Sequence, residues 1–292
     1  MVVYCADIHL TDKQPINRVT PIQPNAIAKL EKIFSIAKNN GKVLIMGGDL
    51  FESPCPSYSL FSQVVDVFLR NKDVKVYGIL GNHDIVYGDT ESHNNAIQTL
   101  VKMGLYTRLS NKPVTIDGVR VFGIDYKKGL YTADDAVKEC NLATNGNVLV
   151  THQFMSPKTL PFNHISLDAF NNTSFWGTVL CSHLHDPFIK TVDKTLFVNP
   201  GCVCRLNRNE AVIEPSVVVF TGACFSKPKV VSLESGPAEF LENTVKKETF
   251  MKSIDDAKVE VTDIETYLES AGESQEVVQE AKRLIKKHSD EV

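Results

Sequence analysis

Residues 74–84 read VKVYGILGNHD, an apolar run that ends in Gly81-Asn82-His83-Asp84. Two earlier runs have the same construction, VVYCADIH at residues 2–9 and KVLIMGGD at residues 42–49. Short apolar runs of this length are typical of buried strands. Open α/β sheets bind ligands beyond the carboxyl ends of their strands. We therefore expect three strands to carry polar side chains to one edge of a sheet.

The segments between and after these runs predict a mixed α/β layout. Apolar residues at helical spacing predict three helices, Ala26–Asn39, Tyr58–Arg70 and Ala96–Met103. The second half predicts more sheet, with hairpins turning at Asp117-Gly118 and Asp193-Lys194. Further strands are expected at Val148–Thr151, Val179–Cys181 and Val217–Phe220.

Two of these later strands also end in histidine, at Thr151-His152 and at Ser182-His183-Leu184-His185. Two side chains spaced two residues apart at a strand end point the same way, which applies to Asp7 and His9 and to His183 and His185. Carboxylate and imidazole donors suit Mn²⁺, Fe²⁺ or Zn²⁺ better than Ca²⁺ or Mg²⁺ alone. Two such ions, roughly 3.5–4 Å apart, can clamp both oxygens of an in-line phosphoryl displacement and lower the pKa of a shared water.

The order D-x-H, G-D, G-N-H-D, H, H-x-H resembles the calcineurin-like metallophosphoesterases over roughly Val2 to Gly201. The resemblance implies an α/β fold, a four-layer α-β-β-α sandwich, and two divalent cations. It assigns one ion to Asp7, His9 and His185, the other to Asn82, His152 and His183, with Asp49 between them. It places His83 beside the scissile phosphate, as a catalytic residue whose tautomer would be fixed by a hydrogen bond that it donates to the catalytic Asp84. Ser182 departs from the family's usual glycine, and its hydroxyl could alter the surroundings of the metal ligands.

Two details resemble the SbcD-type DNA repair exonucleases of bacteria and phages, namely Asp7-Ile8-His9-Leu10 and Gly48-Asp49-Leu50-Phe51-Glu52. This branch implies a Mn²⁺-dependent DNA exo/endonuclease of repair or recombination, with Mg²⁺, Fe²⁺ or Zn²⁺ as alternative ions. It also implies an SbcC-type, SMC-like ATPase as partner and allows a homodimer. Some relatives carry His at the position of Glu52, which leaves cleavage polarity open. The alternative is a phosphodiesterase or phosphatase acting on a small molecule or a phosphoprotein.

The composition is that of an ordinary globular protein, with 292 residues, 23% of them charged, and a net charge of −4. This charge argues weakly against a general polyanion binder. No apolar run of about 18 residues predicts a membrane span, and the first residues lack the features of a signal peptide. Seven cysteines without a framework spacing suit a reducing compartment. We expect a cytoplasmic protein, bacterial or phage-encoded.

Cys202-Val-Cys204 lacks the second cysteine pair of a tetrahedral metal site.

The character of the sequence changes after about Ser226, where Lys and Glu increase and the β runs are expected to stop. We therefore expect a catalytic domain at residues 1–225 and a short, mainly helical segment at residues 226–292. That segment would be a reduced capping or partner-docking element. Arg205 and Arg208, just after the Asn199-Pro200-Gly201 turn, are candidates for contacts with substrate phosphates.

Overall fold

The computed structural model describes residues 1–22, 25–86, 95–128, 132–141, 146–160, 164–170, 175–222 and 225–241. These residues belong to one compact unit, Met1–Leu241, and residues Glu242–Val292 form a second unit outside the described part.

A six-stranded sheet contains the first three predicted strands side by side, in the order β14-β13-β1-β2-β3-β4. Neighbouring strands from β1 to β4 run parallel, whereas β13 pairs with β1 and with β14 antiparallel. The strands are β1 (Val2–Cys5), β2 (Val43–Met46), β3 (Lys75–Gly78), β4 (Thr107–Arg108), β13 (Ser216–Phe220) and β14 (Pro228–Ser232). The parallel β1, β2 and β3 therefore end at one edge of this sheet.

The second six-stranded sheet has the order β11-β12-β10-β7-β6-β5, with four parallel central strands and an antiparallel strand at each edge. Its strands are β5 (Val114–Ile116), β6 (Val119–Ile124), β7 (Asn147–Thr151), β10 (Trp176–Cys181), β11 (Phe188–Val192) and β12 (Thr195–Asn199). The short strands β8 (Met155–Ser156) and β9 (Ile165–Ser166) pair separately. The two histidine-bearing strands, β7 and β10, are neighbours.

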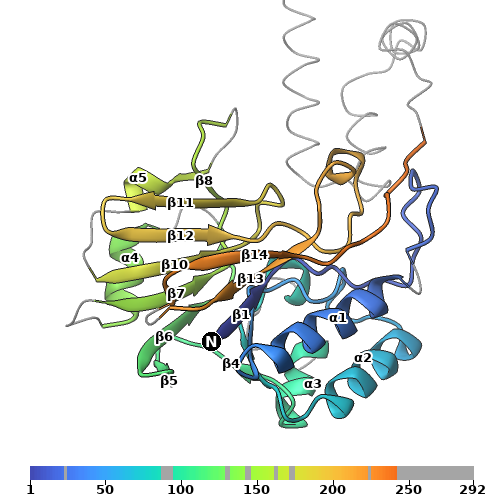
Figure 1. Ribbon diagram of the computed structural model, residues 1–292, viewed down its shortest axis with the longest axis horizontal. Coiled ribbons are helices and arrows are strands. Elements are labelled where there is room, and N and C mark those ends of the chain that lie inside the picture. The colour runs from blue at the N-terminus through green and yellow to red at the C-terminus, as the bar shows by residue number, and fades with distance from the viewer. Residues whose placement is uncertain are drawn as a thin grey trace, which may run out of the picture. The chain divides into compact units, whose positions relative to one another are not determined.

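Five helices accompany the sheets in the described residues: α1 (Asn25–Asn39), α2 (Tyr58–Arg70), α3 (Ala96–Lys102), α4 (Ala133–Glu139) and α5 (Leu167–Phe170). The apolar face of α1 buries Leu30, Ile33 and Phe34 against the first sheet. Helix α2 begins where the side chain of Ser57 accepts a hydrogen bond from the Leu60 amide. Figure 1 shows α1 and α2 on the side of the first sheet that faces away from the second.

The core forms three apolar layers between four layers of secondary structure. Alternate residues of β1 serve different layers, since Val3 packs with α1 and α2 whereas Tyr4 packs between the two sheets. The third layer lies on the outer face of the second sheet, where α4 contributes Ala136. The expected four-layer α-β-β-α sandwich is therefore confirmed.

The three predicted helices and the predicted hairpins are present, but the structure corrects the end of the domain. Strand β14 pairs with β13 over its whole length, so the expectation that β structure stops after Ser226 is wrong. A boundary at residue 225 would separate two adjacent strands of one sheet. Helices α4 and α5 and strands β4, β8 and β9 were not predicted. The expected helical segment lies outside the described residues from residue 242 onward.

None of the helices in the described part of the chain combines the length and the apolar character that crossing a membrane requires.

Candidate metal centre

The loops that follow β1, β2, β3, β7 and β10 carry the seven predicted metal ligands to one place. Loops after β1 and β2 stay paired, because the His9 amide donates to the Asp49 carbonyl at 2.9 Å. The second sheet is tied to the first where the His183 amide donates to the Asp7 carboxylate at 3.1 Å. Residues distant in sequence are thus held together by hydrogen bonds that backbone amides donate.

Several of these residues have a backbone conformation that L-residues rarely adopt. Asp7, His9, Asp49 and His183 have φ of 47°, 51°, 50° and 76°. Such left-handed conformations cost of order 1–3 kcal/mol each and cluster at active and ligand-binding sites. The strained backbone therefore lowers local stability, and it orients these side chains toward one another.

Two positions in the motifs require glycine because another residue of the site packs closely against the backbone there. Gly48 has a φ of 96°, and a Cβ there would lie 2.6 Å from Nδ1 of His152. A Cβ on Gly81 would lie 2.0 Å from Oδ1 of Asp49. Both distances are far below van der Waals contact, so the glycines of G-D and G-N-H-D allow the donor groups to pack together.

The first donor group consists of Asp7, His9 and His185. The Nε2 atoms of His9 and His185 lie 3.1 Å apart, and each is 4.0 Å from Oδ1 of Asp7. Their donor atoms all lie within 4.8 Å of one another, a spacing at which three side chains can share one cation. Asp7 and His9 are buried, whereas the His185 side chain is 26% exposed and opens the group to solvent.

The second donor group contains Asp49, His152 and His183, which also lie within 4.8 Å of one another. Oδ2 of Asp49 is 3.2 Å from Nε2 of His152 and 3.7 Å from Nε2 of His9, so this one oxygen faces both groups. The amide oxygen of Asn82 lies 3.1 Å from Nε2 of His152. The structure therefore brings these side chains together as two neighbouring donor groups, and the assignment of one cation to each group stays a prediction.

The pKa values of the two inner histidines move in opposite directions. Burial alone would lower the pKa of His152, but the carboxylate of Asp49 outweighs it and raises that pKa to about 9. The pKa of His183 falls to about 3, because of burial and then the charge of His152. A neutral imidazole is the form that binds metals, so His183 has a lone pair to offer at any physiological pH.

The predicted hydrogen bond between Asp84 and His83 is absent, which corrects the role assigned to Asp84. Oδ2 of Asp84 accepts the amides of Asp49 and Gly81 at 2.7 and 3.0 Å, and its Oδ1 has no hydrogen-bond partner among the described residues. Nδ1 of His83 lies 3.0 Å from the Glu52 carbonyl oxygen instead. Asp84 thus holds the loops, and the backbone of Glu52 orients the histidine.

Ser182, the departure from the family's glycine, contacts a predicted ligand directly. Its hydroxyl lies 3.0 Å from Nδ1 of His152 and 2.5 Å from the Gly47 carbonyl oxygen, and the same Nδ1 lies 2.8 Å from that carbonyl oxygen. These neutral acceptors hold the proton of His152 on Nδ1, which leaves Nε2 toward Asp49 and Asn82.

Two glutamates that sequence reasoning did not identify as part of the site contact predicted ligands. Oε2 of Glu52 lies 2.7 Å from Nδ1 of His9, and Oε1 of Glu210 lies 2.6 Å from Nδ1 of His185. Cys202 joins His185 and Glu210 in a further set of potential ligands within 4.8 Å. Another such set adds His83 to His9 and Asp49. Glu52 was noted only as the position at which some relatives carry histidine, and Glu210 had no signal in the sequence.

The two candidate phosphate contacts have different environments. Arg205 is buried, and its guanidinium donates to the carbonyls of Ala211 and Gly236 and to the hydroxyl of Ser235. Its hydrogen bonds therefore hold neighbouring segments together and leave little of the group for a substrate phosphate. Arg208 is exposed in the short 3₁₀ turn Arg208–Glu210 (η2), and its predicted contact stays a prediction.

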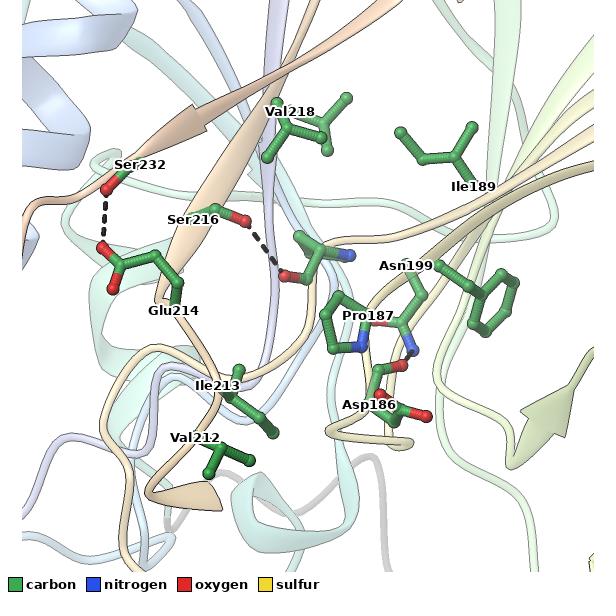
Figure 2. Close-up of a pocket in the computed structure, with 13 residues that line it drawn as sticks. Asp186, Pro187, Ile189, Asn199, Val212, Ile213, Glu214, Ser216, Val218 and Ser232 are labelled. Atoms are coloured by element: carbon green, nitrogen blue, oxygen red, sulfur yellow. Dashed lines mark hydrogen bonds between the residues drawn. The ribbon is translucent and has the colours of Figure 1, made fainter. Parts of the chain in front are cut away.

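A pocket of about 510 Å³ lies beside the loop that follows His185. Figure 2 shows apolar side chains such as Val212, Ile213 and Ile189 along it, together with the carboxylates of Asp186 and Glu214. The donor groups described above are not among its lining residues. Apolar and acidic walls do not favour a phosphate, so the pocket is not the phosphate-binding part of the site.

Comparisons with known proteins place the chain in a family. No curated protein sequence matches it. A solved structure of a Thermus thermophilus protein is similar in fold, with 14% identity, a TM-score of 0.51, and coverage of 80% of this chain and 98% of that one. An archaeal phosphodiesterase has 14% identity and a TM-score of 0.44, over 79% of this chain and 98% of its own. The calcineurin-like phosphoesterase superfamily domain matches residues 1–221, and the chain therefore belongs to this superfamily.

Proposed function

We propose that this chain hydrolyses phosphodiester bonds in DNA, with two divalent cations bound by the seven donors of the candidate centre. One observation carries the two-cation part of the proposal: Oδ2 of Asp49 faces Nε2 of His152 at 3.2 Å and Nε2 of His9 at 3.7 Å. A single carboxylate oxygen between two sets of ligands is what a pair of cations requires. Superfamily members generally depend on two metal ions.

The donor set fits such a pair. Asp7, His9 and His185 would hold one cation, Asn82, His152 and His183 the other, and Asp49 would bridge them. Carboxylate, amide oxygen and imidazole together suit Mn²⁺, Fe²⁺ or Zn²⁺, and we propose Mn²⁺. When bound, the pair supplies a hydroxide near neutral pH and neutralises charge on the phosphate.

His83 is the residue that we propose acts on the leaving oxygen. Its side chain is 36% exposed, so a substrate can reach it. Nδ1 is engaged by the carbonyl of Glu52, which leaves Nε2 as the nitrogen available to a phosphate or leaving-group oxygen. Donation of a proton or a hydrogen bond from this position would stabilise the transition state.

The choice of DNA as substrate rests on two sequence motifs, and the same motifs support the choice of partner. D-x-H-L at Asp7–Leu10 and G-D-L-F at Gly48–Phe51 are shared with SbcD-type nucleases. The same resemblance supports an SbcC-type, SMC-like ATPase as partner, and a role in repair or recombination. Glu52 stands where some relatives carry histidine, and its side chain touches His9, so cleavage polarity is to be measured.

A phosphodiesterase or phosphatase for small molecules or phosphoproteins is the second candidate. The superfamily as a whole acts on phosphoesters, so the metal centre suits either substrate class. The acidic balance of the chain, with a net charge of −4, is compatible with a substrate smaller than a polyanion.

A substrate panel on the full-length chain separates the candidates. Single- and double-stranded DNA, cyclic nucleotides, a generic phosphodiester and phosphopeptides are compared in Mn²⁺, with and without an SMC-like ATPase. We expect Mn²⁺-stimulated DNA cleavage that His83→Ala lowers about 10²–10⁴-fold. Glu31→Gln, an exposed substitution on α1, is the matched control. Turnover of small phosphodiesters far above that of DNA would replace the nuclease by the second candidate.

A further inference from the structure

The histidines of the two donor groups differ in what holds their second ring nitrogen. In the first group both partners are carboxylates: Glu52 on His9 at 2.7 Å and Glu210 on His185 at 2.6 Å. Each carboxylate accepts a hydrogen bond from the Nδ1–H group of its histidine. The lone pair of Nε2 is thereby left pointing at the shared centre of Asp7, His9 and His185.

The second group has neutral partners. Nδ1 of His152 contacts the Gly47 carbonyl oxygen and the Ser182 hydroxyl, at 2.8 and 3.0 Å. The ring of His183 packs against the aromatic rings of Tyr126 and Phe154, with centroids 5.4 and 5.3 Å away. A neutral acceptor orients an imidazole, but it does not add the negative charge that a carboxylate supplies.

We infer that Glu52 and Glu210 are positioning residues that make the position formed by Asp7, His9 and His185 the tighter of the two cation sites. The inference rests on the proposed metal centre. A carboxylate behind a ligating histidine fixes its tautomer, makes its lone pair a stronger donor and adds charge near the cation. Loss of one such partner costs about 10–100-fold in metal affinity.

Glu210 is itself held rigidly, which suits a positioning role. Its Oε2 accepts the amides of Leu206 and Asn207 at 2.6 and 3.0 Å, and its side chain is only 6% exposed. Glu52 is held less firmly, with a side chain 36% exposed. Its position is nevertheless fixed at the backbone, where its amide donates to the carbonyl of Leu10. Removing the carboxylate of Glu210 should therefore weaken the tighter site more than removing that of Glu52.

Unequal sites have a consequence for how the centre fills. At limiting metal the first cation would occupy the Asp7–His9–His185 position in most molecules, and the second position would stay exchangeable. The rate of hydrolysis, which needs both cations, would then depend on the free metal concentration only through the occupancy of the weaker site.

The test is equilibrium dialysis of the metal-free, full-length chain against Mn²⁺, with bound metal measured directly. We expect wild-type protein to bind two ions with dissociation constants at least about tenfold apart. Glu52→Gln and Glu210→Gln should weaken the tighter step about 10–100-fold and leave the weaker step within about twofold. Asn82→Ala should weaken the weaker Mn²⁺ binding step, and Glu31→Gln should change neither binding step.

Circular dichroism checks folding, because Glu210→Gln also removes a partner of two backbone amides; if that variant unfolds, Glu52→Gln decides alone. Two equal steps in wild-type protein, or a tighter step unchanged by Glu52→Gln, would overturn the inference while leaving the proposed hydrolysis intact. A wild-type chain that binds no Mn²⁺ would instead defeat the proposed function, which makes the two failures distinguishable.

Discussion

Nε2 of His9 and Nε2 of His185 lie 3.1 Å apart, although 176 residues separate them along the chain. The Nδ1 atom of each ring contacts a carboxylate, so in the neutral form both Nε2 atoms carry lone pairs that converge. At 3.1 Å the two atoms share a hydrogen bond whenever one of them carries a proton. Burial lowers the pKa of His185, but its hydrogen bonds to Cys202 and Glu210 outweigh burial and raise that pKa to about 11. A cation between the two atoms and Asp7 would displace this proton and bind both lone pairs, so metal binding competes with protonation.

This relationship predicts that Mn²⁺ stabilises the folded chain through His185. At 100 times its dissociation constant a ligand adds about 2.7 kcal/mol to the free energy of unfolding, which for a domain of this size raises Tm by roughly 5–10 °C. We expect this rise in calorimetry of metal-free protein titrated with Mn²⁺, and a much smaller rise for His185→Ala. An undiminished rise in the variant would place the stabilising ion elsewhere.

Substitution of Arg205 should affect the stability of the fold, whereas substitution of Arg208 should affect substrate binding. Arg205→Ala breaks buried hydrogen bonds to Ala211, Ser235 and Gly236, so we expect a loss of about 1–3 kcal/mol in urea unfolding. Arg208→Ala should change stability by less than about 0.5 kcal/mol. If Arg208 meets a DNA phosphate, its removal should also lower the slope of log affinity against log salt by about one. An unchanged slope would remove Arg208 from the DNA interface.

The ligands of the candidate site were predictable because each is marked locally. His152 follows β7 directly, and His9 and Asp49 lie in the loops that begin at the ends of β1 and β2. The end of a parallel strand fixes where the next residues lie. The two glycines that allow close packing, Gly48 and Gly81, stand next to Asp49 and Asn82 in the sequence. Local order along the chain thus marked the polar clusters, whereas the resemblance to the calcineurin-like metallophosphoesterases supplied their assignment to two ions.

The partners of those ligands could not be read in the same way, since they act through space. Glu210 is 25 residues from His185, and nothing in the sequence around it distinguishes this buried acid from acids on the surface. Asp84 adjoins His83, which favoured a hydrogen bond between them, yet its carboxylate turns to the amide of Asp49, 35 residues away. Strand β14 was missed because only Val230 and Val231 are apolar in Pro228–Ser232.

Ser182→Gly tests whether the hydroxyl at the family's glycine position serves the metal centre or only the fold. The substitution removes hydrogen bonds to the carbonyls of Gly47 and Thr151. We expect a loss of about 1–2 kcal/mol in unfolding free energy. Nδ1 of His152 keeps its contact with Gly47, so Mn²⁺ affinity should change by less than about threefold. A loss of about tenfold in affinity would show that the hydroxyl is needed to orient His152.

Asp84 predicts a pH dependence of stability in the metal-free chain. Burial, and then the charge of Asp49, raises the pKa of Asp84 from 3.8 to about 7. Because this folded-state pKa lies above the unfolded one, the folded chain favours the protonated acid. That stabilisation is complete below about pH 3.8 and is lost as the pH rises to about 7. Asp84→Asn keeps an acceptor oxygen for the amides of Asp49 and Gly81 but cannot ionise.

The two proteins should therefore diverge as the pH rises. In urea unfolding with EDTA present, the free energy of unfolding of Asp84→Asn relative to wild type should increase steadily from about pH 4 to about pH 7.5. Glu31→Gln, which removes an exposed carboxylate paired with Arg70, should show no comparable trend. A constant difference between Asp84→Asn and wild type across this range would mean that Asp84 is ionised throughout. The two backbone amides would then hold the pKa of this carboxylate at its ordinary value despite its burial.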